Sequence, residues 1–258
     1  MYFYFYDKFT QDKQYEVELT RIETRLIELG INGRVEKLSI FKNAKELIED
    51  GIKKGAHTVV AVGDDSTFAT VVSIVAAYDV SVGFIPLIQE SRFAEVLGIP
   101  FGQEAANVLS QRLVQDVDLG RIQDHHFLGT LYASEPSQLE LKCDAQYTIS
   151  TTEDTTELRI MNCGDIIGEE MRLMPAADGR IDIVVSPVVE EGMLRKKKVR
   201  QNEKESIFPV KHVEISSGSE SVTLSADGVE NFTTPCEVDV VPSAMKLIVG
   251  RDRKLRTN

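Results

Sequence analysis

The sequence predicts an α/β domain followed by an antiparallel β-sandwich domain, and three observations support this fold class. Strand-like and helix-like segments alternate over the first half of the 258 residues. After about residue 125, short alternating segments separated by turns replace the helical patterns. One apolar run in the first half stops at a single glycine, Gly63, and a polar turn and a helical pattern follow it. We therefore expect two domains, a nucleotide-binding-like domain at residues 1–123 and a sandwich at 124–258.

The elements of the first half follow from their apolar spacing. Apolar residues that recur every three or four positions indicate helices, and continuous apolar runs indicate buried parallel strands. The chain opens with an aromatic strand, and a helix follows whose apolar face ends at Gly30. Further strands are expected at 34–38, 58–62 and 82–86, and further helices at 43–54, 67–78, 92–97 and 104–113. This alternation implies βαβ units with right-handed crossovers.

The second half carries short segments with a period of two. Strands are expected at 127–133, 146–150, 158–161, 181–185, 213–215, 222–224 and 238–240. Asp-Gly and Ser-Gly pairs lie between these segments, and such pairs are typical of the turns that connect antiparallel strands. Residues 201–205 are expected to form a mobile loop.

The composition limits which classes of molecule the protein is expected to bind. A net charge of −12 argues against binding of nucleic acid, which requires a clustered basic surface. No apolar run is long enough to span a bilayer, and the start lacks the features of a signal peptide. Three scattered cysteines indicate a reduced, cytoplasmic protein. The basic run 195–200 is either a solvated loop or a peripheral contact with anionic lipid headgroups on the inner membrane face.

The turn after residue 62 has the position of a phosphate-binding loop but an acidic composition. A glycine-rich turn at a helix N-terminus lets backbone amides approach phosphate oxygens. Here Gly63 is followed by Asp64, Asp65, Ser66 and Thr67. Two interpretations stay open: Asp65 and Ser66 cap the following helix, or the acidic loop holds phosphate through Mg²⁺.

These residues resemble the diacylglycerol kinase catalytic family, which includes bacterial lipid kinases and sphingosine kinases. The family signature Gly-Gly-Asp-Gly-Thr agrees with this chain at Gly63, Asp65 and Thr67. A second signature, Pro-Leu-Gly-Thr-Gly-Asn-Asp-Phe-Ala, agrees at both ends of residues 86–94 but not in its nucleotide-facing middle. The Leu-Gly-Ile-Pro that follows is kept at 97–100.

The resemblance implies a set of ligands and site residues. It implies a first domain akin to that of NAD kinases, with ATP bound at residues 63–67 and at Gln89. A lipid such as diacylglycerol is the implied substrate. It also implies a structural Mg²⁺ on the carboxylate of Asp178 and the backbone oxygens of Ile181 and Ile183.

The resemblance also implies a catalytic base in an Asp-Gly-Glu motif, and here the motif departs from the family. Val229 stands in place of the glutamate, and Glu230 follows one residue later. A one-residue shift in a strand turns a side chain to the opposite face, so Glu230 substitutes only if the turn carries a bulge. Asp227 is the other candidate base, and its alternative role is a tight turn.

Three functions remain after this comparison. The eroded glycines and the missing base favour a degenerate family member with weak or no ATP-dependent phosphotransfer to a lipid hydroxyl. The alternatives are an active, divergent lipid kinase that uses Mg-ATP, and a non-catalytic scaffold that binds a lipid or a protein partner. An NAD kinase-like enzyme is disfavoured, because no Asn-Glu pair follows the acidic loop. The oligomeric state has no signature in the sequence.

Overall fold

The structure, a computed structural model, describes residues 1–39, 42–133, 138–151, 156–165, 171–191, 197–200 and 204–256. The chain divides into two compact units. The first comprises Met1–Val117 and Ser243–Leu255, and the second comprises Asp118–Pro242 and Arg256–Asn258. This division differs from the predicted bounds of 1–123 and 124–258 chiefly because the last long strand returns the chain to the first unit.

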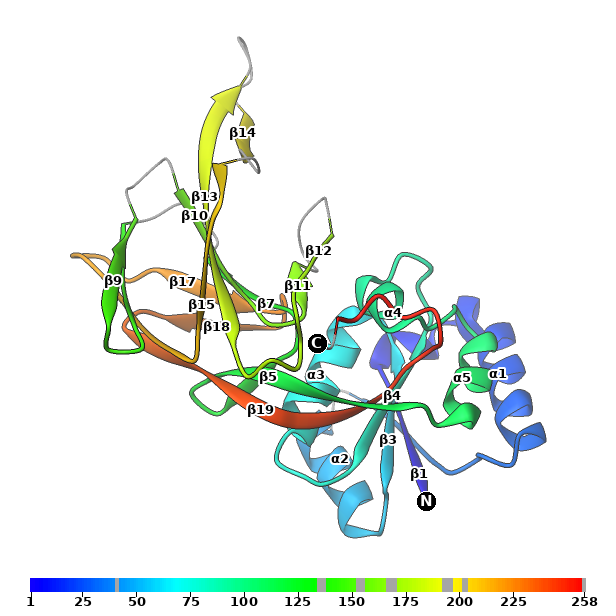
Figure 1. The fold of residues 1–258 in the computed structure, drawn as a ribbon. Coiled ribbons are helices and arrows are strands. Elements are labelled where there is room, and N and C mark those ends of the chain that lie inside the picture. The colour runs from blue at the N-terminus through cyan, green and yellow to red at the C-terminus, as the bar shows by residue number, and fades with distance from the viewer. Residues whose placement is uncertain are drawn as a thin grey trace. The chain divides into compact units, whose positions relative to one another are not determined.

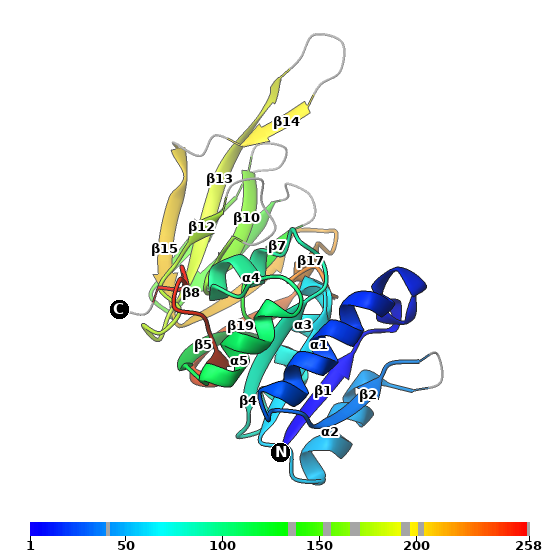
Figure 2. The same cartoon turned by 90° about the vertical axis from the view of Figure 1, so that its right-hand side faces the viewer.

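The first unit is a parallel sheet with helices on both faces (Figures 1 and 2). Its elements are β1 (Tyr2–Tyr6), η1 (Lys8–Gln11), η2 (Lys13–Tyr15), α1 (Glu16–Glu28), β2 (Arg34–Lys37), α2 (Ala44–Lys53), β3 (Thr58–Gly63), α3 (Asp65–Val75), β4 (Ser81–Pro86), α4 (Arg92–Leu97) and α5 (Glu104–Gln111). The strand order is β2-β1-β3-β4, and the end of β19 (Cys236–Ile248) pairs with β4 in parallel. Helices α1 and α5 cover one face, and α2 and α3 cover the other. The predicted α/β domain is confirmed.

The central strands of this sheet are continuous apolar runs in the sequence because both of their faces are buried. Every residue of β3 and β4 is buried, as expected for strands that are covered on both faces. Alternate residues of the strands pack against opposite helices. Phe84 in β4 stacks on Phe68 in α3 with ring centroids 4.7 Å apart. Tyr4 in β1 donates its hydroxyl to the carbonyl of Ile31, 2.5 Å away, just beyond the end of α1.

The second unit is an antiparallel sandwich, as predicted. Its strands are β6 (His125–Phe127), β7 (Thr130–Ala133), β8 (Leu139–Cys143), β9 (Tyr147–Ser150), β10 (Thr156–Met161), β11 (Gly164–Asp165), β12 (Arg172–Leu173), β13 (Ile181–Glu191), β14 (Lys197–Arg200), β15 (Ser206–Val210), β16 (His212–Ser217), β17 (Thr223–Ala226) and β18 (Glu230–Thr233), and β5 (Val114–Ile122) leads into it. One sheet has the order β14-β13-β10-β7-β17-β18, and in the other β16 lies between β19 and β8. Leu141 and Val213 from one sheet share a core with Ile160 and Leu224 from the other.

Three sequence expectations need correction. The strand predicted at 238–240 is the 13-residue β19, whose far end completes the parallel sheet of the first unit. The described part of the basic run, Lys197–Arg200, is the strand β14 paired with β13 rather than a solvated loop, and residues 195–196 lie outside the described residues. Residues 201–203 also lie outside them, but the side chain of Glu205 is buried and accepts a hydrogen bond from Ser186, so this end of the predicted mobile loop is held by contacts.

Among the described residues, no helix combines the length and the hydropathy that crossing a bilayer requires.

Candidate functional site

The first loop is closed by a reciprocal cap at the start of α3. Asp64 accepts a hydrogen bond from the backbone nitrogen of Thr67 (2.8 Å), and the Thr67 hydroxyl accepts one from the backbone nitrogen of Asp64 (3.3 Å). Such a capping box satisfies two backbone donors at the helix N-terminus. A Cβ atom at Gly63 would lie 2.4 Å from the Thr67 hydroxyl oxygen, so only glycine fits before this cap. The cap therefore explains both Gly63 and Thr67 without a ligand.

Asp65 caps a different helix from the one that it begins. Its carboxylate accepts hydrogen bonds from the Ser91 hydroxyl and from the backbone nitrogen of Arg92, 2.8 Å away, at the start of α4. Burial raises the pKa of Asp65 above its ordinary value, although these hydrogen bonds oppose the shift. The side chain thus joins the first loop to the second loop, which carries Gln89. The capping interpretation therefore fits both acids in different ways. Asp64 caps α3, and Asp65 accepts hydrogen bonds at the start of α4, whose N-cap is Ser91. Ser66, which the sequence analysis named as a cap, is exposed.

Asp7 is a third acid at this edge, and sequence analysis missed it. It follows β1 and accepts hydrogen bonds from the backbone nitrogen of Phe9 (3.2 Å) and the Thr67 hydroxyl (3.1 Å). The carboxyl ends of neighbouring parallel strands meet at one edge of a sheet, where ligands of α/β proteins bind. An aspartate directly after β1 and another directly after β3 were the available signal. The structure therefore brings Asp7, the 63–67 loop and the second loop together.

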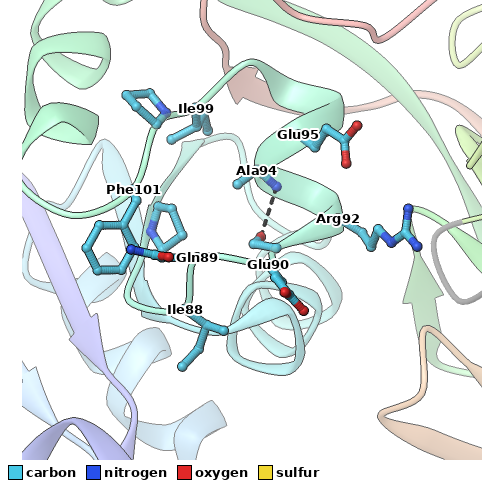
Figure 3. A pocket seen from close by; sticks show the side chains of 11 residues that line it. Ile88, Gln89, Glu90, Arg92, Ala94, Glu95, Ile99 and Phe101 are labelled. Carbon is cyan, nitrogen blue, oxygen red and sulfur yellow. Dashed lines mark hydrogen bonds between the residues drawn. The ribbon is translucent and has the colours of Figure 1, made fainter.

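The second loop forms one wall of a pocket of about 560 Å³ (Figure 3). The pocket is lined by Pro86, Ile88, Gln89, Glu90, Ser91, Arg92, Ala94, Glu95, Ile99, Pro100 and Phe101. Ile88 and Glu90 stand where the family signature has glycines, yet neither residue has a positive φ. The loop has thus adopted a conformation that needs no glycine. Gln89 is exposed and lines this pocket.

The C-terminal segment fixes the other end of α4. Gly98 ends the helix with a φ of 66°, and a Cβ atom there would lie 2.5 Å from the backbone nitrogen of Arg253. The backbone nitrogen of Gly250 donates to the carbonyl of Leu97 (2.8 Å), and Lys254 forms an ion pair with Glu95 (2.7 Å). Asp65 at one end and this segment at the other hold α4 in place.

Asp227, a predicted base in the second unit, is surrounded by backbone donors. Its carboxylate accepts hydrogen bonds from the backbone nitrogens of Leu128 (2.9 Å), Gly129 (3.0 Å) and Thr130 (2.7 Å). The residue is 8% exposed and has a left-handed φ of 49°. Both oxygens therefore hold the turn between β6 and β7. This arrangement favours the turn interpretation, and a role of Asp227 as a base stays a prediction.

Glu230 is the first residue of β18, and the register of the β17–β18 hairpin is continuous, without the bulge that the sequence analysis named as the condition for replacing the missing glutamate. The backbone nitrogen of Val229 donates to the carbonyl of Ala226 (2.9 Å), while Ala226 pairs with Glu230 across the hairpin. Three residues therefore connect β17 and β18. Glu230 is exposed, and its catalytic role stays a prediction.

The predicted Mg²⁺ ligands lie in and beside β13. Asp178 accepts a hydrogen bond from the backbone nitrogen of Arg180 (3.0 Å), which closes a local turn. Ile181 and Ile183 are fully buried and pair with β15. Burial, together with the nearby carboxylate of Asp178, raises the pKa of Asp182. In the part of the chain that the structure describes, no three histidine, cysteine, aspartate or glutamate side chains are grouped as metal ligands. The Mg²⁺ site stays a prediction.

The fold of the chain matches that of solved bacterial diacylglycerol kinases. The crystal structure of a diacylglycerol kinase from Bacillus anthracis str. Sterne superposes with a TM-score of 0.77 at 18% identity, covering 98% of this chain and 97% of that one. In sequence, residues 2–122 match the family model described as "Diacylglycerol kinase catalytic domain". Residues 2–122 are thus similar to a diacylglycerol kinase catalytic domain, and the resemblance drawn from the motifs is confirmed.

Two named relatives match over shorter stretches. A "Probable lipid kinase YegS-like" of Xanthomonas euvesicatoria is 32% identical over 91 residues, which are 33% of this chain and 29% of the relative. A "Diacylglycerol kinase" of Mycobacterium tuberculosis is 28% identical over 98 residues, 36% of this chain and 32% of the relative. The match thus spans about a third of the length of each relative.

Proposed function

We propose that this chain is a degenerate lipid-kinase-family protein with weak or no transfer of phosphate from ATP to a lipid hydroxyl. The observation that carries the proposal is the use of both loop carboxylates as internal caps. The backbone nitrogens of Thr67 and Arg92 donate to Asp64 and Asp65, respectively. Backbone amides at such positions are the groups that hold phosphate in phosphate-binding loops. A phosphate chain therefore does not fit these loops as they stand.

The missing base supports the same conclusion. Val229 has no proton-accepting group, and the carboxylate of Asp227 accepts three backbone hydrogen bonds. General-base catalysis contributes typically about 10²–10⁴-fold to a rate, and each lost electrostatic contact to the transition state about 10²–10³-fold. The combined loss favours a protein whose basal phosphotransfer is negligible.

An active, divergent kinase is the second candidate, and family membership favours it. Such an enzyme would hold Mg-ATP through the acidic loop. Asp64 uses its Oδ1 atom for the cap, whereas both oxygens of Asp65 accept hydrogen bonds from the second loop. A metal at this loop would have to displace the Asp65 contacts. A scaffold that binds a lipid or a protein at the membrane surface is compatible with the degenerate function.

The experiment that tests the proposal is a phosphotransfer assay. The intact protein is incubated with γ-labelled Mg-ATP and vesicles that contain diacylglycerol or sphingosine, beside a bacterial diacylglycerol kinase with the intact glycine signature. We expect labelled lipid at least about 10⁴-fold below the reference enzyme, from the losses given above. Labelled lipid within about 100-fold of the reference would contradict the proposal and support the active alternative.

A further inference from the structure

We infer that the β5–β6 hairpin is an acid-sensitive element, in which protonation of His125 and His126 opens β6 and releases the turn held by Asp227. This property goes beyond the proposed function and does not depend on phosphotransfer. The sheet has the local strand order β6-β5-β19-β16. Three of the four histidines of the chain lie on β6 and β16, so they are gathered in one small part of the second unit.

Strand β6 is held on one side only. It is three residues long, and among the strands of the described residues it pairs with β5 alone. The register sets His126 opposite Arg121. The ring of Phe127 packs on Gly120, where an added Cβ atom would collide with the ring. Because so short an edge strand has few contacts to lose, it belongs to the low-stability part of the fold, where a change in charge is enough for local opening.

The surroundings of His126 disfavour a proton on its ring. Arg121 faces it from β5, His125 is its neighbour in β6, and Asp124 in the turn is the opposing acid. The guanidinium of Arg121 already binds the carboxylate of Asp239 on β19, 2.9 Å away. Burial lowers the pKa of His126, and the positive charges of Arg121 and His125 lower it further, against the effect of Asp124.

The other two histidines of the group add to the effect of acid. His125 has its ring against that of Phe232 on β18, with centroids 5.6 Å apart, and burial lowers its pKa. His212 on β16 is bonded through its Nδ1 atom to Asp239, 2.7 Å away. A proton on His212 brings a second cation to this carboxylate, so that Asp239 neutralises Arg121 less completely. Acid therefore increases the positive charge on both sides of β5.

The hairpin leads directly into the turn that Asp227 holds. The backbone nitrogens of residues 128–130, which follow β6 in the chain, donate to the Asp227 carboxylate. Phe127 and Leu128 are fully buried, so β6 and the start of the turn are anchored together. Opening of β6 withdraws this anchor, and the hydrogen bonds to Asp227 weaken with it.

The sign of the pH dependence follows from the lowered pKa values of the two β6 histidines. The closed hairpin binds these protons less tightly than the open hairpin, in which both rings reach water. The closed form is therefore fully favoured above the ordinary histidine pKa of about 6.5, and this preference is lost as pH falls below it. One pH unit below that value, each ring that stays neutral in the closed form favours opening about tenfold.

The test is amide hydrogen exchange of the intact protein at about pH 7.5 and about pH 5.5, corrected for the intrinsic exchange rate at each pH. We expect protection at residues 120–130 to fall about 10–100-fold between the two, about tenfold for each histidine. Strands β3 and β4 contain no histidine and should keep their protection. Unchanged protection at residues 120–130, or an equal fall in β3 and β4, would overturn the inference.

A double variant links the effect to the two histidines. His125→Phe combined with His126→Gln removes both proton acceptors and keeps a ring against Phe232. This variant should keep its protection at residues 120–130 when the pH is lowered. His57→Gln, at the exposed fourth histidine in the first unit, is the matched control and should lose protection as the original protein does. An equal fall in the double variant would contradict the assignment to His125 and His126.

Proton NMR of the histidine rings decides the question if the double variant does not fold. In the original protein, the rings of His125 and His126 should titrate below about pH 6.5. Arg121→Gln should raise the pKa of His126, because a neighbouring cation is gone, and should reduce the fall in protection. Titration of both rings at or above about pH 6.5 in the original protein would overturn the inference.

Discussion

Replacing Asp227 with glycine is expected to lower the free energy of unfolding by about 3–5 kcal/mol, because three backbone donors lose a charged acceptor. The carboxylate lies within 2.7–3.0 Å of the nitrogens of Leu128, Gly129 and Thr130. Glycine is the suitable replacement because the native φ of 49° strains most residues with a Cβ atom, alanine included. Urea denaturation gives the stability, and hydrogen exchange at amides 128–130 reports the turn directly.

Asp227→Asn is the matched variant for this experiment. Asparagine keeps the shape and tolerates a left-handed φ, but its amide nitrogen faces backbone donors. We expect a loss smaller than that of glycine and still above 1 kcal/mol. If both variants were as stable as the original protein, Asp227 would not anchor the turn, and a catalytic role would become the better explanation.

Replacing Asp65 with alanine is expected to lower the free energy of unfolding by about 2–3 kcal/mol, because the Ser91 hydroxyl and the Arg92 amide at the start of α4 lose their charged acceptor. Ser91 is 6% exposed, so its hydroxyl cannot easily find water as a substitute. Asp65→Asn keeps one acceptor and should lose about 1 kcal/mol at neutral pH. Denaturation in urea, with hydrogen exchange at the Arg92 amide, measures both.

The pH dependence of Asp65 has a definite sign. Burial raises the pKa of Asp65, so the folded protein binds this proton more tightly than the unfolded chain does. Stability from this group is therefore lost as pH rises through the window between the two pKa values, and gained as pH falls. The stability of the original protein relative to Asp65→Asn should rise as pH falls from neutral toward about 4. A relative stability that falls instead would indicate a lowered pKa and a more favourable environment for the charge.

The alternation of elements made most of the fold predictable from the sequence. Continuous apolar runs located β3 and β4, because strands covered on both faces carry no polar alternation. The far end of β19 was not predictable in the same way. Exposed and partly buried polar positions interrupt its pattern, and its pairing with β4 joins residues far apart in the sequence. Local periodicity contains no information about such a pairing.

The candidate site was predictable in position but not in detail. The chain signals a polar turn after residue 62, and this turn lies at the carboxyl edge of the sheet with Asp7 and the second loop. Which helix each acid caps depends on tertiary geometry, since Asp65 reaches Ser91 across 26 positions of sequence. The bounds of α4 were predicted, but the contacts at its two ends and the backbone donors around Asp227 were not, because their partners are distant in the chain.

The central claim is that the protein's own carboxylates take the place of a phosphate group at the two loops. The most direct test is a calorimetric titration of the intact protein with ATP, with and without Mg²⁺. The account predicts that ATP does not bind at millimolar concentration, either with or without Mg²⁺. Binding of ATP that requires Mg²⁺ would contradict it, because the acidic loop would then hold phosphate through the metal.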